Sequence, residues 1–229
     1  MASRAVNTRK AAADWRAGLR RSIRRTAQMT GAGALLLAMF FLALALVTYT
    51  PTDPSLSTAA SGDQIGNWMG RAGAWVSNFV LLVFGLPAVL LLPLLYVSAR
   101  KLWSDVEHED DGDEDEAPTR WWGPLALLAL AMALFSTVLA ITLPTPGGSL
   151  PAQLGGLTGL LSAGAIEALA TRIAGDAAGW ITLGAAVASL AGGVALSTKV
   201  FAIDWRSHLP LPAILSGGGG LSGILARMP

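Results

Sequence analysis

Long uncharged runs of apolar residues dominate the hydropathy pattern of this 229-residue chain. A helix needs about 20 such residues to cross the roughly 30 Å hydrocarbon core of a bilayer. Windows close to that length predict four transmembrane helices, over residues 31–50, 74–99, 121–143 and 177–198. Pro144 and Pro146 end the third, because proline has no N–H and clashes with the preceding turn. The pattern therefore predicts an all-α integral membrane protein.

Basic residues predict the orientation of these helices, because loops rich in Lys and Arg stay in the cytoplasm. Of the sixteen Lys and Arg, eight precede residue 31, three lie between the second and third predicted spans, and three follow the fourth. Arg71 and Arg172 lie one in each of the other loops. We therefore expect both termini and the middle loop to be cytoplasmic. A cleaved secretory signal fits the N-terminus less well, since the first apolar run exceeds the usual core of about 7–15 residues.

Composition agrees with a membrane protein, since 53% of the residues are hydrophobic, 14% are charged and the mean hydropathy is +0.54. We expect a basic cytoplasmic tail over residues 1–30 and a membrane domain over 31–205. Residues 206–229, which include the run SGGGG at 216–220, read as the start of a flexible cytoplasmic linker.

The middle loop, residues 104–120, is strongly acidic. It holds eight Asp or Glu residues between 107 and 116, and such dense like charge favours a solvated coil. A calcium-binding loop with Glu107 as its first residue would need a bidentate Glu as its twelfth, where Pro118 stands. The chain has no cysteine, which excludes disulfides and thiolate metal sites. We predict no metal site and no cofactor.

The segment 144–176 is the larger of the two predicted external loops. Its stretch 154–170 is moderately apolar but is followed by Arg172 and contains Glu167, so it predicts an amphipathic or re-entrant segment at the membrane surface. A further span is the open alternative.

No catalytic residue is predicted. The sequence lacks the phosphate-binding pattern GxxxxGK followed by Ser or Thr. The four predicted spans contain no Asp, Glu, Lys, Arg or His that could activate a hydroxyl such as that of Ser136 or relay an ion or proton.

Two groups of residues are candidates for contacts instead. Gly184, Ala188 and Gly192 recur at steps of four and would let another helix approach closely, either within the bundle or in a second copy. Around the first external loop, Trp68 and Trp75 share a helical face and predict either an aromatic belt or a docking surface for a partner. The other candidates for interface or partner contacts there are Tyr49, Asp53, Pro54 and Arg71.

Three short motifs carry a resemblance to a known family. The first span leaves the membrane through LVTYTPTDPS at residues 46–55, the segment NWMGRAGAW follows at 67–75, and FGLP follows at 84–87. Their order resembles that of the N-terminal membrane domain of the FtsK/SpoIIIE family of DNA translocases, the four-transmembrane domain. The resemblance covers most of residues 20 to 206, including the basic tail and the acidic loop.

The resemblance implies a role in the bacterial inner membrane. In that family the domain anchors a translocase at the division septum, works with other division proteins, and is linked to a hexameric, ATP-driven DNA motor. The sequence lacks the motor's lysine motif, so we expect a fragment or a truncated or split product that acts as scaffold and anchor rather than as an enzyme. The alternative is a small channel or transporter subunit in which residues 144–176 line the path.

Overall fold

The computed structural model describes residues 2–58, 64–108, 122–144 and 149–201, which are helical apart from the connecting turns. Six α-helices and two short 3₁₀ helices follow one another in this described part of the chain. In order they are α1 (Ala2–Val47), α2 (Gly70–Phe84), η1 (Leu86–Leu90), α3 (Leu91–His108), α4 (Trp122–Thr142), α5 (Gly156–Ala174), η3 (Gly175–Ala177) and α6 (Ala178–Val200).

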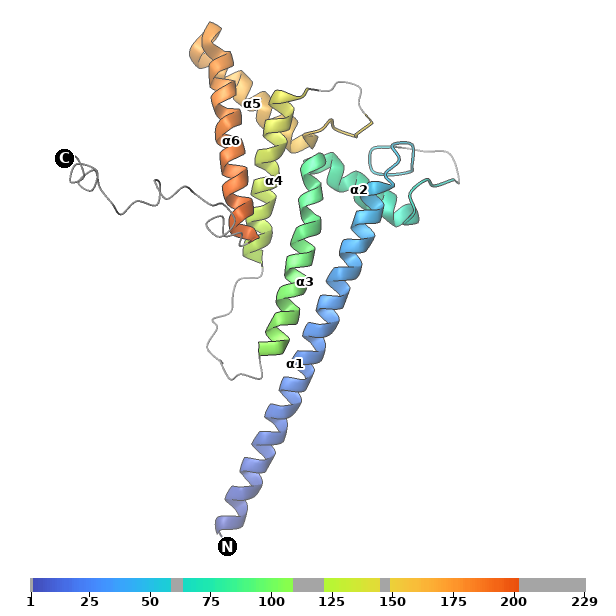
Figure 1. Cartoon of the computed structure of the whole chain (residues 1–229), viewed down its shortest axis with the longest axis vertical. Coiled ribbons are helices and arrows are strands. Elements are labelled where there is room, and N and C mark those ends of the chain that lie inside the picture. Colours follow the sequence, from blue (N-terminus) through green and yellow to red (C-terminus); the bar gives the residue numbers. More distant parts are fainter. Residues whose placement is uncertain (1, 59–63, 109–121, 145–148, 202–229) are drawn as a thin grey trace, which may run out of the picture.

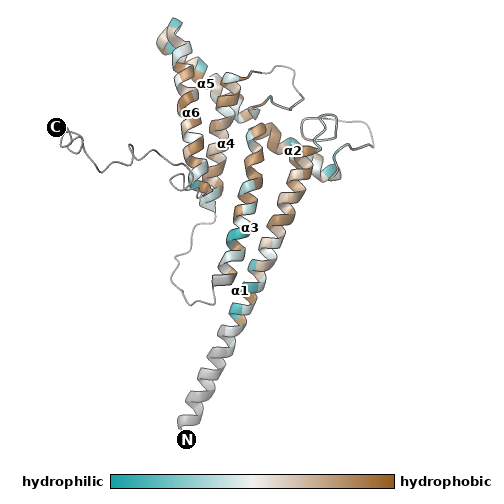
Figure 2. Cartoon of the chain, in the orientation of Figure 1, coloured by the Kyte–Doolittle hydropathy of each residue, from teal (hydrophilic) through white to brown (hydrophobic). Residues whose placement is uncertain are grey.

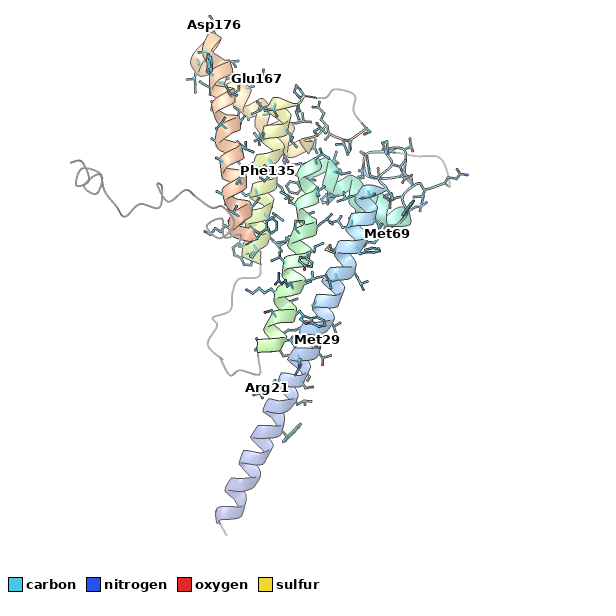
Figure 3. The ribbon with its side chains drawn as sticks, in the orientation of Figure 1. Arg21, Met29, Met69, Phe135, Glu167 and Asp176 are labelled. Carbon is cyan, nitrogen blue, oxygen red and sulfur yellow. The ribbon has the colours of Figure 1, made fainter. Side chains whose placement is uncertain are left out.

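The long helices form two antiparallel pairs, α1 with α3 and α4 with α6 (Figure 1). Small residues let the first pair approach closely, since Ala32 and Ala45 on α1 and Ala99 on α3 are buried. In the second pair, Phe135 of α4 packs against Gly193 of α6 (Figure 3). The short helix α2 runs across the end of the first pair and, with α5, joins it to the second (Figure 1).

Four helical stretches are long and apolar enough to cross a membrane: Gly18–Val47, Leu86–Ser104, Trp122–Thr142 and Gly156–Val200. The hydropathy colouring shows apolar residues along α3, α4, α6 and the half of α1 that packs on α3 (Figure 2). Large apolar side chains on these helices point outward, including Leu37 at 73% exposure and Val187 at 62%. Contiguous apolar surface of this kind would be a liability in water and suits contact with lipid. The predicted all-α membrane fold is therefore confirmed.

The predicted span over 74–99, which contains Pro87 and Pro93, is divided between two helices, because the chain breaks at Gly85. That residue has φ +65° and ψ −145°, a conformation that only glycine adopts readily, and its N–H caps α2 by bonding to the carbonyl of Leu81. The stretch able to span begins at Leu86, after the break. Pro93 lies in the first turn of α3, where a missing N–H costs no helical bond.

Other boundaries agree more closely with the prediction. Helices α4 and α6 lie within two residues of the predicted spans 121–143 and 177–198. The predicted basic tail, residues 1–30, is not a separate unit, because α1 runs unbroken from Ala2 into the membrane span. Helix α3 continues to His108, into the predicted acidic loop 104–120. The rest of that loop, and the predicted linker 206–229, lie outside the described residues.

The segment predicted to lie at the membrane surface, 154–170, folds mainly as α5. Its first turns pack beside Ser136, within α4, and its last turn leads through η3 into α6. Helices α5 and α6 thus form a hairpin that rises beyond the end of α4, with Glu167 and Asp176 toward its far end (Figure 3). The hairpin places the two carboxylates at the periphery of the bundle rather than at its centre.

Candidate functional site

Buried polar side chains gather at one end of the bundle, where α1 ends and α3 begins. In a membrane protein such groups need internal partners, because lipid offers no hydrogen bonds. Within the described residues, the buried polar or charged ones are Asp53, Asn67, Ser77, Asn78, Ser136 and Thr137. They form two adjoining sets, which we call the loop clasp and the glycine junction.

The loop clasp is built on Asp53, whose side chain is only 4% exposed. One carboxylate oxygen accepts the backbone N–H of Gly66 at 2.8 Å and the other accepts that of Asn67 at 2.9 Å. Hydrogen bonds to a charged acceptor contribute roughly 1.5–3 kcal/mol each. Asp53 therefore fastens the start of the loop between α1 and α2 to its end.

Asn67 continues the clasp toward both helices. Its side-chain N–H donates to the carbonyl of Ala45 near the end of α1, at 2.8 Å, and its Oδ1 accepts the N–H of Met69 just before α2. The hydroxyl of Thr48 accepts the N–H of Trp68 at 3.1 Å. The free carbonyl and N–H groups left by the two helix ends are thus partly satisfied by the loop.

Asn78 ties the middle of α2 to the same loop. Its Nδ2 donates to the hydroxyls of Ser57, at 2.8 Å, and of Tyr49, at 3.4 Å. Gly73, one turn before Ser77 on the same face, is in contact with Asn67 and has no room for a Cβ. The face of α2 that turns inward is therefore small and polar.

The glycine junction joins the two helix pairs by close backbone contact. Leu86 donates its N–H to the carbonyl of Leu154 at 2.9 Å, and a Cβ on Gly156 would lie 2.5 Å from the nitrogen of Gly85. Gly155 is equally close to the carbonyl of Ser136. Side chains larger than hydrogen at these glycines would push α2, α4 and α5 apart.

Hydroxyl groups complete the junction by bonding the last carbonyls of α2. The hydroxyl of Ser136 donates to the carbonyl of Phe84 at 2.7 Å, and that of Thr158 donates to the carbonyl of Val83 at 2.9 Å. Nearby, the hydroxyls of Thr137 and Ser162 lie 2.6 Å apart and bond each other. Helices α4 and α5 thus add hydrogen bonds to carbonyls at the C-terminal end of α2, beside the one that Gly85 makes.

The predicted contact residues of the first loop divide into inward and outward sets. Asp53 is internal, and Tyr49 and Pro54 are half-buried, whereas their role as interface or partner contacts stays a prediction. Trp68, Arg71 and Trp75 are exposed on the outward side. The structural roles of Asn67, Asn78 and Gly85 were not predicted from the sequence, although a Gly followed by Leu-Pro at 85–87 signals a turn.

The small-residue stripe packs within the chain only at its last member. A Cβ on Gly192 would lie 3.1 Å from the Leu134 side chain, whereas a Cβ on Gly184 would meet nothing within 4 Å, and Ala188 is exposed. The choice between packing in the bundle and packing in a second copy stays a prediction for this stripe.

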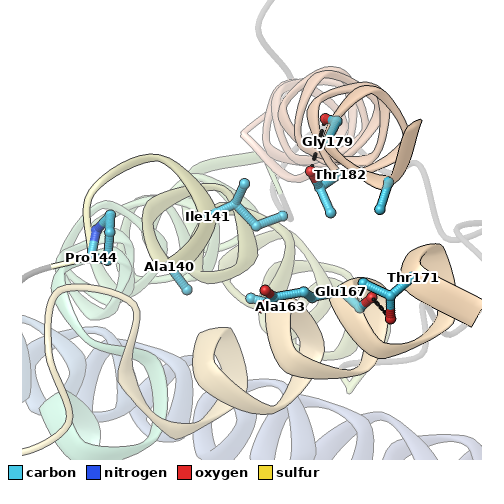
Figure 4. Close-up of a pocket in the computed structure, with 9 residues that line it drawn as sticks. Ala140, Ile141, Pro144, Ala163, Glu167, Thr171, Gly179 and Thr182 are labelled. Atoms are coloured by element: carbon cyan, nitrogen blue, oxygen red, sulfur yellow. Dashed lines mark hydrogen bonds between the residues drawn. The ribbon is translucent and has the colours of Figure 1, made fainter. Parts of the chain in front are cut away.

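A half-open pocket of about 340 Å³ lies between the outer end of α4 and the α5–α6 hairpin (Figure 4). Glu167 is the charged group in its wall, beside the hydroxyls of Thr171 and Thr182, which bond to carbonyls of their own helices. In the described part of the chain, no group of three or more His, Cys, Asp or Glu side chains is placed to hold a metal ion. Helices are joined instead by the polar groups of the loop clasp and the glycine junction.

Comparison with known proteins shows the family to which this membrane architecture belongs. A family model described as the 4TM region of DNA translocase FtsK/SpoIIIE matches residues 24–206. The chain belongs to the FtsK/SpoIIIE family. The FtsK match begins within α1 and extends past the end of α6, so it includes both helix pairs, the loop clasp and the glycine junction.

Curated FtsK relatives match parts of the same region. A DNA translocase FtsK from Pseudomonas putida is 33% identical over 149 residues, 63% of this chain and 16% of the relative. One from Vibrio vulnificus is 36% identical over 97 residues, 42% of this chain and 9% of the relative. DNA translocase FtsK 2 from Ralstonia nicotianae is 33% identical over 127 residues, 53% of this chain and 16% of the relative. The chain thus spans less than a fifth of each of these relatives. No solved structure matches it.

Proposed function

We propose that this chain is the membrane-anchoring and septum-localising domain of a DNA translocase that acts in cell division and chromosome segregation, with the ATPase motor outside these 229 residues. The family match over residues 24–206 carries this proposal. It is supported by relatives of which the chain covers only 9–16% and whose printed name is DNA translocase FtsK. A chain of this kind holds the translocase at one place in the membrane, while ATP hydrolysis and DNA movement belong to the rest of the translocase.

The proposed mechanism is physical. Tethering a motor at one place in the membrane raises its effective concentration there, without any new contact to DNA. A tether of this kind must resist pulling. The glycine junction and the loop clasp suit that demand, because backbone contacts and buried hydrogen bonds join the two helix pairs and leave little room for sliding.

We propose that both termini lie in the cytoplasm, where a motor would reach chromosomal DNA. The supporting observation is the distribution of charge, because Arg20, Arg21, Arg24 and Arg25 lie exposed on α1 just before the apolar part of its span (Figure 3). Contacts with other division proteins, and assembly into a hexamer, belong to the same proposal. Gly184 and Ala188, exposed on α6, are the candidates for contacts between copies.

A domain exchange tests the proposed function. In Pseudomonas putida, the segment of the DNA translocase FtsK that matches this chain is replaced by residues 1–206, and chromosome segregation and cell length are measured. The proposal expects the exchange to support division, whereas deletion of the segment does not. The matched control replaces the segment with an unrelated four-helix membrane protein of the same orientation. If that control works as well as this chain, membrane tethering alone is sufficient and the septum-localising role is refuted.

A further inference from the structure

Helix α2 turns small and polar residues toward the protein and several large apolar side chains outward. A helix between protein and water has the opposite arrangement. The buried residues of α2 are small or polar apart from one leucine: Gly73, Ala74, Ser77, Asn78 and Leu81. Three of its large apolar side chains point away from the protein, with exposures of 45% for Trp75, 38% for Val76 and 53% for Phe79. Trp68, just before the helix, is 74% exposed. Something other than the described part of this chain must cover that face.

The position of α2 limits what can cover it. Its 15 residues make a helix of about 22 Å, too short for a hydrocarbon core of roughly 30 Å. It also runs across the ends of α1 and α3 rather than beside them (Figure 1). The hydrogen bond from Asn67 to the carbonyl of Ala45 holds it at the end of α1. Helix α2 therefore lies at the level where the first helix pair leaves the hydrocarbon.

The composition of the outward face matches that level of a bilayer. Tryptophan prefers the headgroup layer, because its ring is apolar and its N–H is polar. Arg71 is exposed on the same side between Trp68 and Trp75, three and four residues away along the chain. At that position a guanidinium can bond lipid phosphate while its stem lies along apolar surface.

Exposed apolar side chains also follow directly after α2, on a stretch that is able to cross the membrane. Beyond Phe79, exposed apolar side chains follow at Leu86, 44% exposed, and Val89, 47% exposed. Both belong to the stretch Leu86–Ser104, which is able to span the membrane. A protein partner that covered α2 alone would leave Leu86 and Val89 exposed to lipid. Lipid can cover both α2 and the start of the stretch Leu86–Ser104.

We propose that α2 is an in-plane membrane helix, with Trp68, Trp75 and Phe79 inserted at the boundary between phospholipid headgroups and acyl chains and Arg71 bonded to lipid phosphate. It would act as a second anchor point, perpendicular to the spanning helices. It would resist tilting of the first helix pair, because tilting would lift one end of α2 out of the lipid. This proposal needs only that the chain is a membrane protein, so it stands or falls separately from the septal role.

The absence of cysteine allows a direct test by spin labelling. Single variants Trp75→Cys, Val76→Cys and Phe79→Cys, each labelled with a nitroxide, are reconstituted in nanodiscs of phosphatidylethanolamine and phosphatidylglycerol. The accessibility of each label to oxygen, which concentrates in lipid, is compared with its accessibility to a water-soluble nickel chelate. The exposed loop position Thr52→Cys is the aqueous control, and the outward position Leu37→Cys, in the middle of the first span, is the hydrocarbon control.

We expect the three α2 labels to give oxygen-to-nickel ratios above that of the Thr52→Cys label and below that of the Leu37→Cys label. Ratios equal to the Thr52→Cys value would place the face in water and overturn the proposal. Low accessibility to both reagents would mean that a protein surface, such as a second copy, covers the face, and would also overturn it. Because the labelled positions are exposed, helical content by circular dichroism should be unchanged, and using three positions guards against one misfolded variant.

Discussion

The substitution Gly85→Ala tests whether the glycine junction holds the two helix pairs together. The backbone of Gly85, at φ +65° and ψ −145°, lies in a region that costs other residues about 1–3 kcal/mol. An alanine Cβ would also overlap the carbonyl oxygen of Leu154, which accepts the N–H of Leu86. Breaking that buried hydrogen bond costs about 1–3 kcal/mol more. We therefore expect Gly85→Ala to lower the free energy of unfolding by about 2–6 kcal/mol.

Gly70→Ala is the control for an alanine at positive φ. Gly70 has the same φ of +65°, but a Cβ there would meet nothing within 4 Å. It should cost only the conformational part, about 1–3 kcal/mol. Both variants are unfolded reversibly by SDS in mixed micelles, with helical content followed by circular dichroism. If Gly85→Ala destabilises no more than Gly70→Ala, the close contact with residue 154 is not the constraint and the account of the junction is refuted.

Three further predictions concern the clasp, the junction and the orientation. Asp53→Asn should destabilise by about 1–3 kcal/mol in the same SDS titration, because one of two backbone N–H groups loses its acceptor; an unchanged midpoint would contradict the clasp. Ser136→Ala should cost about 1–3 kcal/mol by leaving a carbonyl of α2 without a donor, whereas Thr142→Ala, whose hydroxyl bonds only within its own helix, should cost less. In whole cells with a permeable outer membrane, a membrane-impermeant maleimide should label Thr52→Cys and not Ser22→Cys, and the reverse pattern would invert the proposed orientation.

Much of the membrane architecture follows from hydropathy. Helices α4 and α6 begin and end close to the predicted positions, because uncharged runs with prolines or charges at their ends leave few alternatives. The family could also be identified from the sequence, because short motifs around the first loop keep a characteristic order. Both kinds of information are local in the chain.

The break at Gly85 could not be predicted in the same way, because hydropathy does not report backbone conformation. The window 74–99 is uncharged throughout, yet its first part forms α2 and a tight turn separates it from α3. The turn depends on Leu154 and Ser136, which lie more than 50 residues further along the chain. A single glycine before Leu-Pro suggests that the helix is interrupted there. It does not indicate the direction in which the chain continues after the break.

The inward role of Asp53 depends on distant partners too. From the sequence alone, an aspartate in a proline-flanked loop looks like a surface residue. In the structure its carboxylate is enclosed because Gly66 and Asn67, 13 and 14 residues later, present their N–H groups to it. For Trp68 and Trp75, periodicity identified a shared face, but the partners of Asn67 and Asn78 decide that this face points outward.

The most direct test of the proposed role is the position of the chain in a dividing cell. A fluorescent protein fused to the C-terminus of residues 1–206 is followed by microscopy in Pseudomonas putida that retains its own DNA translocase FtsK. The account predicts a band at the division septum, in addition to any signal around the cell envelope. A uniform envelope signal throughout the cell cycle, from a fusion shown to be intact and in the membrane, would contradict the claim that this domain localises a translocase to the septum.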